Sequence, residues 1–217
     1  MVITDEILNS HIDKLKSIIY GINYNKVTIL VGKNGTGKSL IRKQLGLRLQ
    51  KEFGDSHSHL RQVSMQLRTE TYSSLGALST IAHDDPADPT SLCSYNLLTT
   101  TMNYDMESKK DYYIVLDELE VGMSTETILG VVQELKTLIP KWLENCLGIL
   151  VITHSEVFAE ELYNIFDCDF INLGYNEVDY DFEKWLNREL IPTDMKFLEE
   201  WSTALYHEIN KHTKSRD

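Results

Sequence analysis

A glycine-rich segment in the first part of the chain has the composition and spacing of a phosphate-binding loop. Gly32-Lys-Asn-Gly-Thr-Gly-Lys38-Ser39 fits G-x-x-x-x-G-K-[ST] and stands between an apolar run and a helical pattern. Its glycines allow successive backbone N–H groups to curve around phosphate oxygens, Lys38 can reach the β- and γ-phosphates, and the Ser39 hydroxyl can ligate Mg²⁺. The residues expected to bind the nucleotide are Asn34, Gly35, Thr36, Gly37, Lys38, Ser39 and Leu40.

Two adjacent acids at the end of a second apolar run predict the metal ligand and the general base. In Ile114-Val-Leu-Asp117-Glu118 the carboxylate of Asp117 ends a strand pattern, where it can hold Mg²⁺ through water. A carboxylate just beyond the metal ligand can polarise a water molecule for in-line attack on a γ-phosphate. We therefore expect Glu118 to be the general base.

A polar triplet ends the third apolar run, Leu150-Val-Ile-Thr153-His154-Ser155. Ligands of open parallel sheets sit at the carboxyl ends of the strands, so Thr153 and His154 should emerge beside Asp117 and Glu118. We expect His154 to contact the γ-phosphate.

These motifs need a framework of strands and helices, and the hydrophobic pattern predicts one. Short apolar runs alternate with amphipathic stretches of helical spacing, which is typical of an α/β fold with a mostly parallel sheet flanked by helices. The predicted strands are 26–32, 59–67, 112–116, 147–153 and 169–173. The predicted helices are 7–22, 38–51, 125–143, 156–166, 181–190 and 194–211. We expect residues 1–174 to form the ATPase domain, with an N-terminal helix in 1–25, and residues 175–217 to form a C-terminal helical appendage.

Length and composition exclude several classes of protein. A chain of 217 residues with 42% hydrophobic and 25% charged residues resembles an ordinary globular domain, which buries roughly 70% of its surface. The longest apolar stretch, 147–152, is far shorter than the ~20 residues of a membrane helix, so we expect no membrane insertion. Acids stand near the start, where a secretory signal has Lys or Arg, and the three cysteines have no metal-ligand spacing. We therefore expect a cytoplasmic protein with reduced thiols.

Charge is distributed unevenly along the chain. The formal net charge is −12, which argues against a surface that binds nucleic acid throughout. Residues 1–68 carry 11 basic and 5 acidic residues, whereas the rest of the chain carries 10 and 28. The basic part contains the phosphate-binding loop, which accounts for most of its excess. We expect contact with DNA only within a larger complex.

Taken together, these motifs resemble those of the ABC-type ATPases. The closest branch is the soluble one, which includes chromosome-maintenance and double-strand-break repair ATPases and many bacterial defence and phage-encoded ATPases. The resemblance covers 26–174 and includes Glu120-x-Gly122-x-Ser124 after the acidic pair. It implies that His154 is the switch histidine and that 121–124 form a loop that crosses a dimer interface. It also implies that Gln66, with Gln62 as the alternative, senses Mg²⁺ and the γ-phosphate.

The chain departs from the family in its signature and its helical subdomain. The family contacts the partner's γ-phosphate with Ser-Gly-Gly, and the nearest match, Cys93-Ser94-Tyr95-Asn96, has lost both glycines. Either Ser94 or Ser91 acts in trans, or the serine is an ordinary N-cap. The stretch between Lys38 and Asp117 is shorter than usual, so we expect a reduced helical subdomain.

Some residues are open to both a functional and a structural interpretation. Tyr20 or Tyr24 could stack on adenine, although packing against the sheet is the favoured alternative. Ser56-His57-Ser58-His59 has alternating histidines, which are more typical of a solvated loop than of a metal site. The C-terminal aromatics are either core residues or a surface for a partner; they are Phe182, Trp185, Phe197, Trp201 and Tyr206.

The sequence predicts an ATPase that binds ATP and Mg²⁺, forms a homodimer around them and hydrolyses ATP to switch a separate effector or sensor protein. A defence or DNA-processing complex is the favoured setting. The alternatives are the nucleotide-binding subunit of a membrane transporter and an ATP-gated scaffold without turnover.

Overall fold

The computed structural model describes residues 3–54, 59–64, 111–175 and 177–214. Within these ranges a six-stranded sheet has the order β2-β3-β4-β1-β5-β6. The strands β1 to β5 are all parallel, and β6 pairs antiparallel with β5. The strands are β1 (Val27–Gly32), β2 (Leu60–Ser64), β3 (Tyr113–Asp117), β4 (Gly148–Ile152), β5 (Cys168–Leu173) and β6 (Val178–Asp179). The predicted α/β fold with a mostly parallel sheet is confirmed.

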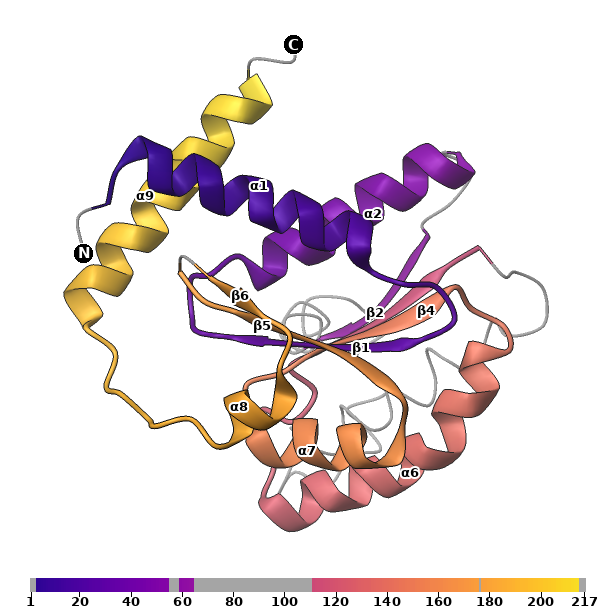
Figure 1. The fold of residues 1–217 in the computed structure, drawn as a ribbon. Helices are drawn as coiled ribbons and strands as arrows, with labels where there is room; N and C mark the ends of the chain where they lie inside the picture. Colours follow the sequence, from indigo (N-terminus) through magenta and orange to yellow (C-terminus); the bar gives the residue numbers. More distant parts are fainter. Residues whose placement is uncertain (1–2, 55–58, 65–110, 176, 215–217) are drawn as a thin grey trace, which may run out of the picture.

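Helices cover both faces of the sheet (Figure 1). One face carries α1 (Asp5–Gly21) and α2 (Lys38–Phe53). The other carries α6 (Thr125–Leu143), α7 (Glu156–Ile165) and the short α8 (Phe182–Leu186). The last helix, α9 (Met195–Lys214), crosses α1 and packs against it.

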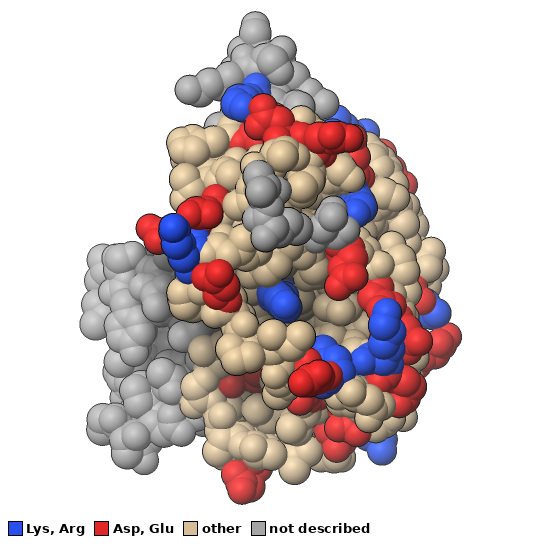
Figure 2. Space-filling view, turned by 60° about the vertical axis from the view of Figure 1, so that its left-hand side comes forward, with Lys and Arg blue, Asp and Glu red and all other residues tan. Residues whose placement is uncertain are grey.

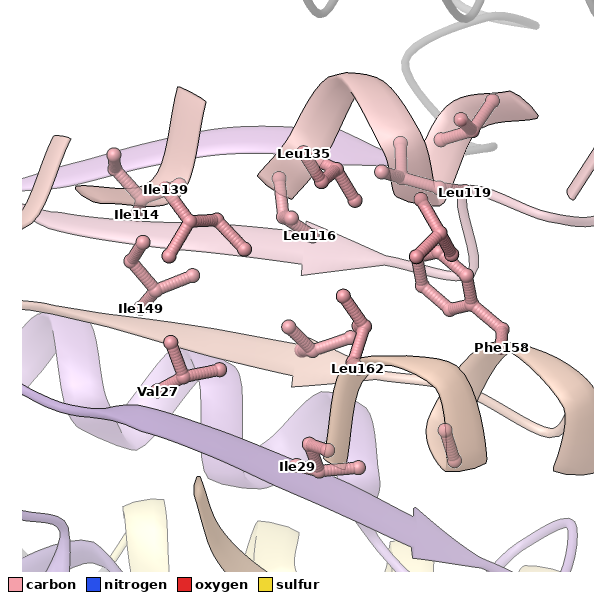
Figure 3. Packing of buried hydrophobic residues seen from close by; sticks show 14 of the residues in the cluster. Val27, Ile29, Ile114, Leu116, Leu119, Leu135, Ile139, Ile149, Phe158 and Leu162 are labelled. Atoms are coloured by element: carbon pink, nitrogen blue, oxygen red, sulfur yellow. The ribbon is translucent and has the colours of Figure 1, made fainter. Parts of the chain in front are cut away.

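The strands bury alternate residues on opposite faces, as a sheet between two helical layers requires. In β3, Ile114 and Leu116 point toward α6 and α7, where they meet Leu135 and Phe158 (Figure 3). The alternating residues of the same strand, Tyr113 and Val115, join the core under α1 and α2. Full burial of a side chain of this size stabilises the fold by about 1.5–3 kcal/mol. The core therefore fixes the positions at which the strand ends emerge.

A third, smaller cluster joins the N- and C-terminal helices. Leu8 and Ile12 of α1 pack against Trp201 and Leu205 of α9, and Trp201 is completely buried. The amphipathic patterns of 7–22 and 194–211 correctly predict these helices. The helix predicted at 181–190 is shorter, because α8 ends at Leu186.

The order of the strands sets the distance between the motifs. Strand β4 lies between β1 and β3, and Ile152 pairs with both Leu30 and Asp117. The carboxyl ends of β4 and β3 are therefore level, β1 continues past them to Gly32, and β1 and β3 are roughly 10 Å apart. In the described part of the chain, no helix is both long and apolar enough to cross a membrane.

Candidate nucleotide-binding site

The glycine-rich loop connects β1 to α2 and leaves the start of α2 open to an anion. Gly35 and Gly37 have φ values of 75° and 99°, in the left-handed region that favours glycine. Gly37 is the N-cap of α2 and has no side chain to bond the first N–H groups, whereas Ser124 and Ser155 cap α6 and α7 with their hydroxyls. The free N–H groups of α2 can therefore bind phosphate oxygens.

Lys38 lies folded back over this loop. Its Nζ donates to the carbonyl oxygens of Gly32 and Lys33, both at 3.0 Å, and the residue is buried. Burial lowers the pKa of Lys38 to about 8, although the negative charges of Glu118 and Asp117 oppose this shift. A phosphate in the loop would provide the negative charge that this buried amine lacks.

Asp117 ends β3 with a cation already beside it. Arg42 Nη1 of α2 lies 2.5 Å from Asp117 Oδ2, in a pair that is largely buried. Burial raises the pKa of Asp117, and the charge of Arg42 opposes this shift. Arg42 was not predicted as a partner of Asp117, because its position in the sequence does not show which way its side chain points.

Glu118 and His154 are brought together from neighbouring strand ends. His154 Nε2 lies 3.2 Å from Glu118 Oε1, and each side chain is about one-third exposed, at 38% and 35%. Burial and the charge of Lys38 lower the pKa of His154, with Glu118 opposing. Neutral His154 can donate its Nε2–H to the carboxylate. Glu118 has a φ of 55°, a strained value for a residue with a side chain, of the kind found at functional sites.

Glu120, a buried acid to which the sequence motif assigned no role of its own, holds the turn after β4. Glu120 Oε1 accepts from Thr153 Oγ1 at 2.5 Å and from the backbone N–H of His154 at 3.2 Å. Its other oxygen is buried and has no hydrogen-bond partner in the described structure. Burial raises the pKa of Glu120, and these hydrogen bonds oppose the shift. Glu120 thus positions His154 without facing the cavity itself.

The predicted residues surround one cavity of about 320 Å³. It is lined by Asn34, Gly35, Gly37, Lys38, Ser39, Glu118, His154, Ser202, Leu205, Tyr206 and Ile209. The loop, the base and the histidine therefore face one space, although they come from three segments. The last four residues belong to α9. The amphipathic pattern of α9 predicts a buried face but not the element that the face covers.

Several predicted residues lie elsewhere. Thr36, Leu40 and Asp117 are next to the cavity residues in sequence but do not line it. Gln62 lies within β2, two residues before its end, and its side chain is half-buried. Gln66, Ser91 and Ser94 are outside the described residues, so their roles stay predictions.

The alternative that Tyr20 or Tyr24 stacks on adenine is not supported. Both tyrosines precede β1, whereas the loop follows its other end, roughly 20 Å away along a strand of this length. Their rings lie 5.9 and 5.2 Å from the guanidinium of Arg48, near the far end of α2.

His59, the only member of the His57/His59 pair within the described residues, has a structural environment. Its two ring nitrogens lie 2.8 and 2.7 Å from the carbonyl oxygens of Asp111 and Gly54. The ring is buried and fixes the entry to β2, so the solvated-loop interpretation is wrong for this histidine.

The donor set at the cavity fits Mg²⁺ only together with a nucleotide. Among the described residues, no group of three or more His, Cys, Asp or Glu side chains could hold a metal. Mg²⁺ at phosphate sites needs only one or two carboxylates, because phosphates and water complete its octahedron. The Ser39 hydroxyl and the Asp117 carboxylate, at the ends of the loop and of β3, are donors of this kind.

Comparisons with known proteins show only distant likeness. The sequence matches no protein-family model, and it matches no curated protein. Among solved structures, Caenorhabditis elegans PCH-2 is 15% identical with a TM-score of 0.38, and the alignment covers 79% of this chain and 40% of that one. Saccharomyces cerevisiae RIF2 is 10% identical with a TM-score of 0.42, covering 94% and 76%. Aeropyrum pernix ORC2, solved as ADPNP–ADP complexes, is 14% identical with a TM-score of 0.34, covering 78% and 46%.

The chain thus spans less than half of the PCH-2 and ORC2 chains, and likeness this distant does not identify a function. Its own geometry gives the firmer conclusion, which is an α/β fold with a glycine-rich loop between β1 and α2.

Proposed function

We propose that this chain binds Mg-ATP and hydrolyses it. The observation that supports this most strongly is that one cavity is lined by Lys38 and Ser39 of the loop, Glu118 after β3 and His154 after β4. Phosphoryl transfer to water needs a cradle for the phosphates, a metal ligand and a carboxylate near the attacking water. The cavity and its surroundings supply residues for all three.

Each residue has a distinct role in this proposal. Lys38 exchanges the carbonyl oxygens of Gly32 and Lys33 for phosphate oxygens, and Glu118 accepts the proton of the attacking water. Glu118 and the turn that Glu120 holds position His154, whose Nε2–H exchanges the Glu118 carboxylate for the γ-phosphate when ATP binds. Bound Mg²⁺, held by Ser39 and through water by Asp117, would neutralise phosphate charge.

We further propose, from the resemblance alone, that the chain acts as an ABC-type ATPase of the soluble branch. In that proposal two copies close around ATP, the loop at Val121–Ser124 faces the second copy, and hydrolysis switches a separate effector or sensor protein. Gln66 would sense Mg²⁺ and the γ-phosphate, and residues 1–174 would form the ATPase domain.

The test compares Lys38→Ala with Lys51→Ala, which removes a charge from the last turn of the same helix. Mg-ATP should stabilise the wild type and Lys51→Ala in thermal unfolding, by an amount that grows with the logarithm of ligand concentration, and should not stabilise Lys38→Ala. Phosphate release should follow the same order. Equal shifts for the two variants would show that the loop is not the site.

A further inference from the structure

The helix α9 packs directly on the phosphate-binding loop. A Cβ atom on Gly35 would lie 2.5 Å from Ser202 Oγ and 3.1 Å from a methyl carbon of Leu198. Figure 1 shows α9 crossing α1 on the side of the molecule where β1 leads into α2. The loop and α9 are thus in contact, although they are far apart in the sequence.

The core holds α9 firmly in this position. Trp201 is fully buried and packs edge-on against the ring of His11 in α1, with 5.3 Å between the ring centroids. His11 Nε2 lies 2.8 Å from the carbonyl oxygen of Thr36 in the loop. One chain of contacts therefore runs from α9 through α1 to the loop, and it fixes the side of α9 that faces the cavity.

Four residues of α9 form one side of the cavity, and we call them the α9 wall. They are Ser202, Leu205, Tyr206 and Ile209. Glu118 and His154 line the same cavity from the strand ends. Since the water activated by Glu118 must attack the γ-phosphate, this cavity holds the γ-phosphate end of the nucleotide.

We propose that the α9 wall lines one side of the γ-phosphate end of the site in cis, and that Ser202 and Tyr206 there distinguish ATP from ADP. This inference rests on the proposed function. The two hydroxyls can donate to γ-phosphate oxygens, and Leu205 and Ile209 add apolar surface to the same wall. The wall contains no Lys or Arg, so its contribution is hydrogen bonding and shape.

Tyr206 is suited to this role and to its test. It is 66% exposed on the rim of the cavity, so the fold does not depend on its side chain. A control of the same type exists in Tyr180, which is 64% exposed and lies outside the cavity.

The experiment measures ATP and ADP affinity by titration calorimetry in the full chain. A hydrogen bond to a charged group is worth about 1.5–3 kcal/mol, so Tyr206→Phe and Ser202→Ala should each weaken ATP binding roughly tenfold or more. ADP, which lacks the γ-phosphate, should bind these variants as it binds the wild type. Tyr180→Phe should leave both affinities unchanged.

The possible outcomes distinguish a failure of the α9 wall proposal from a failure of the proposed function. The proposal about the α9 wall would be wrong if both variants kept the ATP affinity of the wild type, or if they lost equal affinity for ATP and ADP. Neither result would contradict ATP binding itself. If the wild type binds neither nucleotide, the proposed function itself is wrong.

Discussion

Arg42 of α2 and Asp117 of β3 form an ion pair of 2.5 Å at the place where a metal ion would approach the carboxylate. The pair lies mostly away from water, so Arg42 neutralises a charge that burial makes costly. A metal ion at Asp117 would supply the same neutralisation.

We predict that Arg42→Ala destabilises the nucleotide-free protein by about 1–3 kcal/mol, because Asp117 loses its counter-ion. Mg-ATP should then raise the melting temperature of the variant more than that of the wild type, since Mg²⁺ replaces the missing charge. Lys43→Ala, an exposed neighbour on α2, is the control. Identical Mg-ATP shifts in all three proteins would contradict the prediction.

Glu118→Gln tests the chemistry separately from binding. The amide keeps the shape of the side chain but cannot accept the proton, so turnover should fall roughly 10²–10⁴-fold while ATP still binds. Phosphate release and calorimetry measure the two effects, with Glu126→Gln, an exposed acid at the start of α6, as the control. Hydrolysis at the wild-type rate would refute the base assignment.

The same variant tests the proposed homodimer. If ATP holds two copies together until it is hydrolysed, Glu118→Gln should elute as a dimer with Mg-ATP and as a monomer without it. Size exclusion with light scattering measures this directly. An inactive variant that stays monomeric with ATP would keep the base and exclude the homodimer.

The burial of Glu120 leads us to predict that the stability of the fold depends on pH. Burial raises its pKa in the folded protein, so the ionised form costs folding free energy above its ordinary pKa, and the cost disappears as the pH falls. Glu120→Gln removes the charge and keeps an acceptor for Thr153. The variant should therefore melt above the wild type at pH 7, with the difference shrinking toward pH 5.

Glu120→Ala is the contrast. It leaves Thr153 Oγ1 and the N–H of His154 without their acceptor, which should destabilise the fold by about 1–3 kcal/mol. Thermal melts from pH 5 to 8 separate the two variants. A Glu120→Gln difference that does not vary with pH would show that folding does not shift the pKa of this carboxyl.

Gly35→Ala should destabilise the protein for two separable reasons. Its φ of 75° costs a side chain about 1–3 kcal/mol, and the new methyl meets Ser202 Oγ. Adding Ser202→Ala should recover the second part only, which a double-mutant cycle of unfolding free energies measures. Gly130→Ala in α6, where a Cβ has open space, should be neutral or stabilising. Strict additivity would contradict the contact.

We predict that the isolated chain binds DNA weakly at physiological salt. On the face shown in Figure 2, the Lys and Arg side chains of the described residues lie singly or in small groups among Asp and Glu. The net charge of −12 repels a phosphate backbone. Fluorescence anisotropy with a labelled duplex should show little binding without nucleotide. Tight, strongly salt-dependent binding would contradict this.

The sequence was sufficient to predict those site residues whose role follows from local spacing. The loop motif needs only one strand and one helix, and the parallel-sheet rule correctly placed Glu118 and His154 together. It was insufficient where a function depends on packing between distant segments. Arg42 and the α9 wall carry no motif, and the motif that contains Glu120 does not reveal its contact with Thr153. The two-residue strand β6 is too short for any periodicity to reveal.

The α9 wall also links the site to the order in which the polypeptide is made. The phosphate-binding loop leaves the ribosome early, whereas Met195–Lys214 is among the last segments described. Segments near the N-terminus begin to fold first during synthesis. A nascent chain would therefore have its loop and strand ends in place before the proposed α9 wall can line the γ-phosphate end of the cavity. In this proposal, tight binding of ATP requires that α9 has been synthesised and packed.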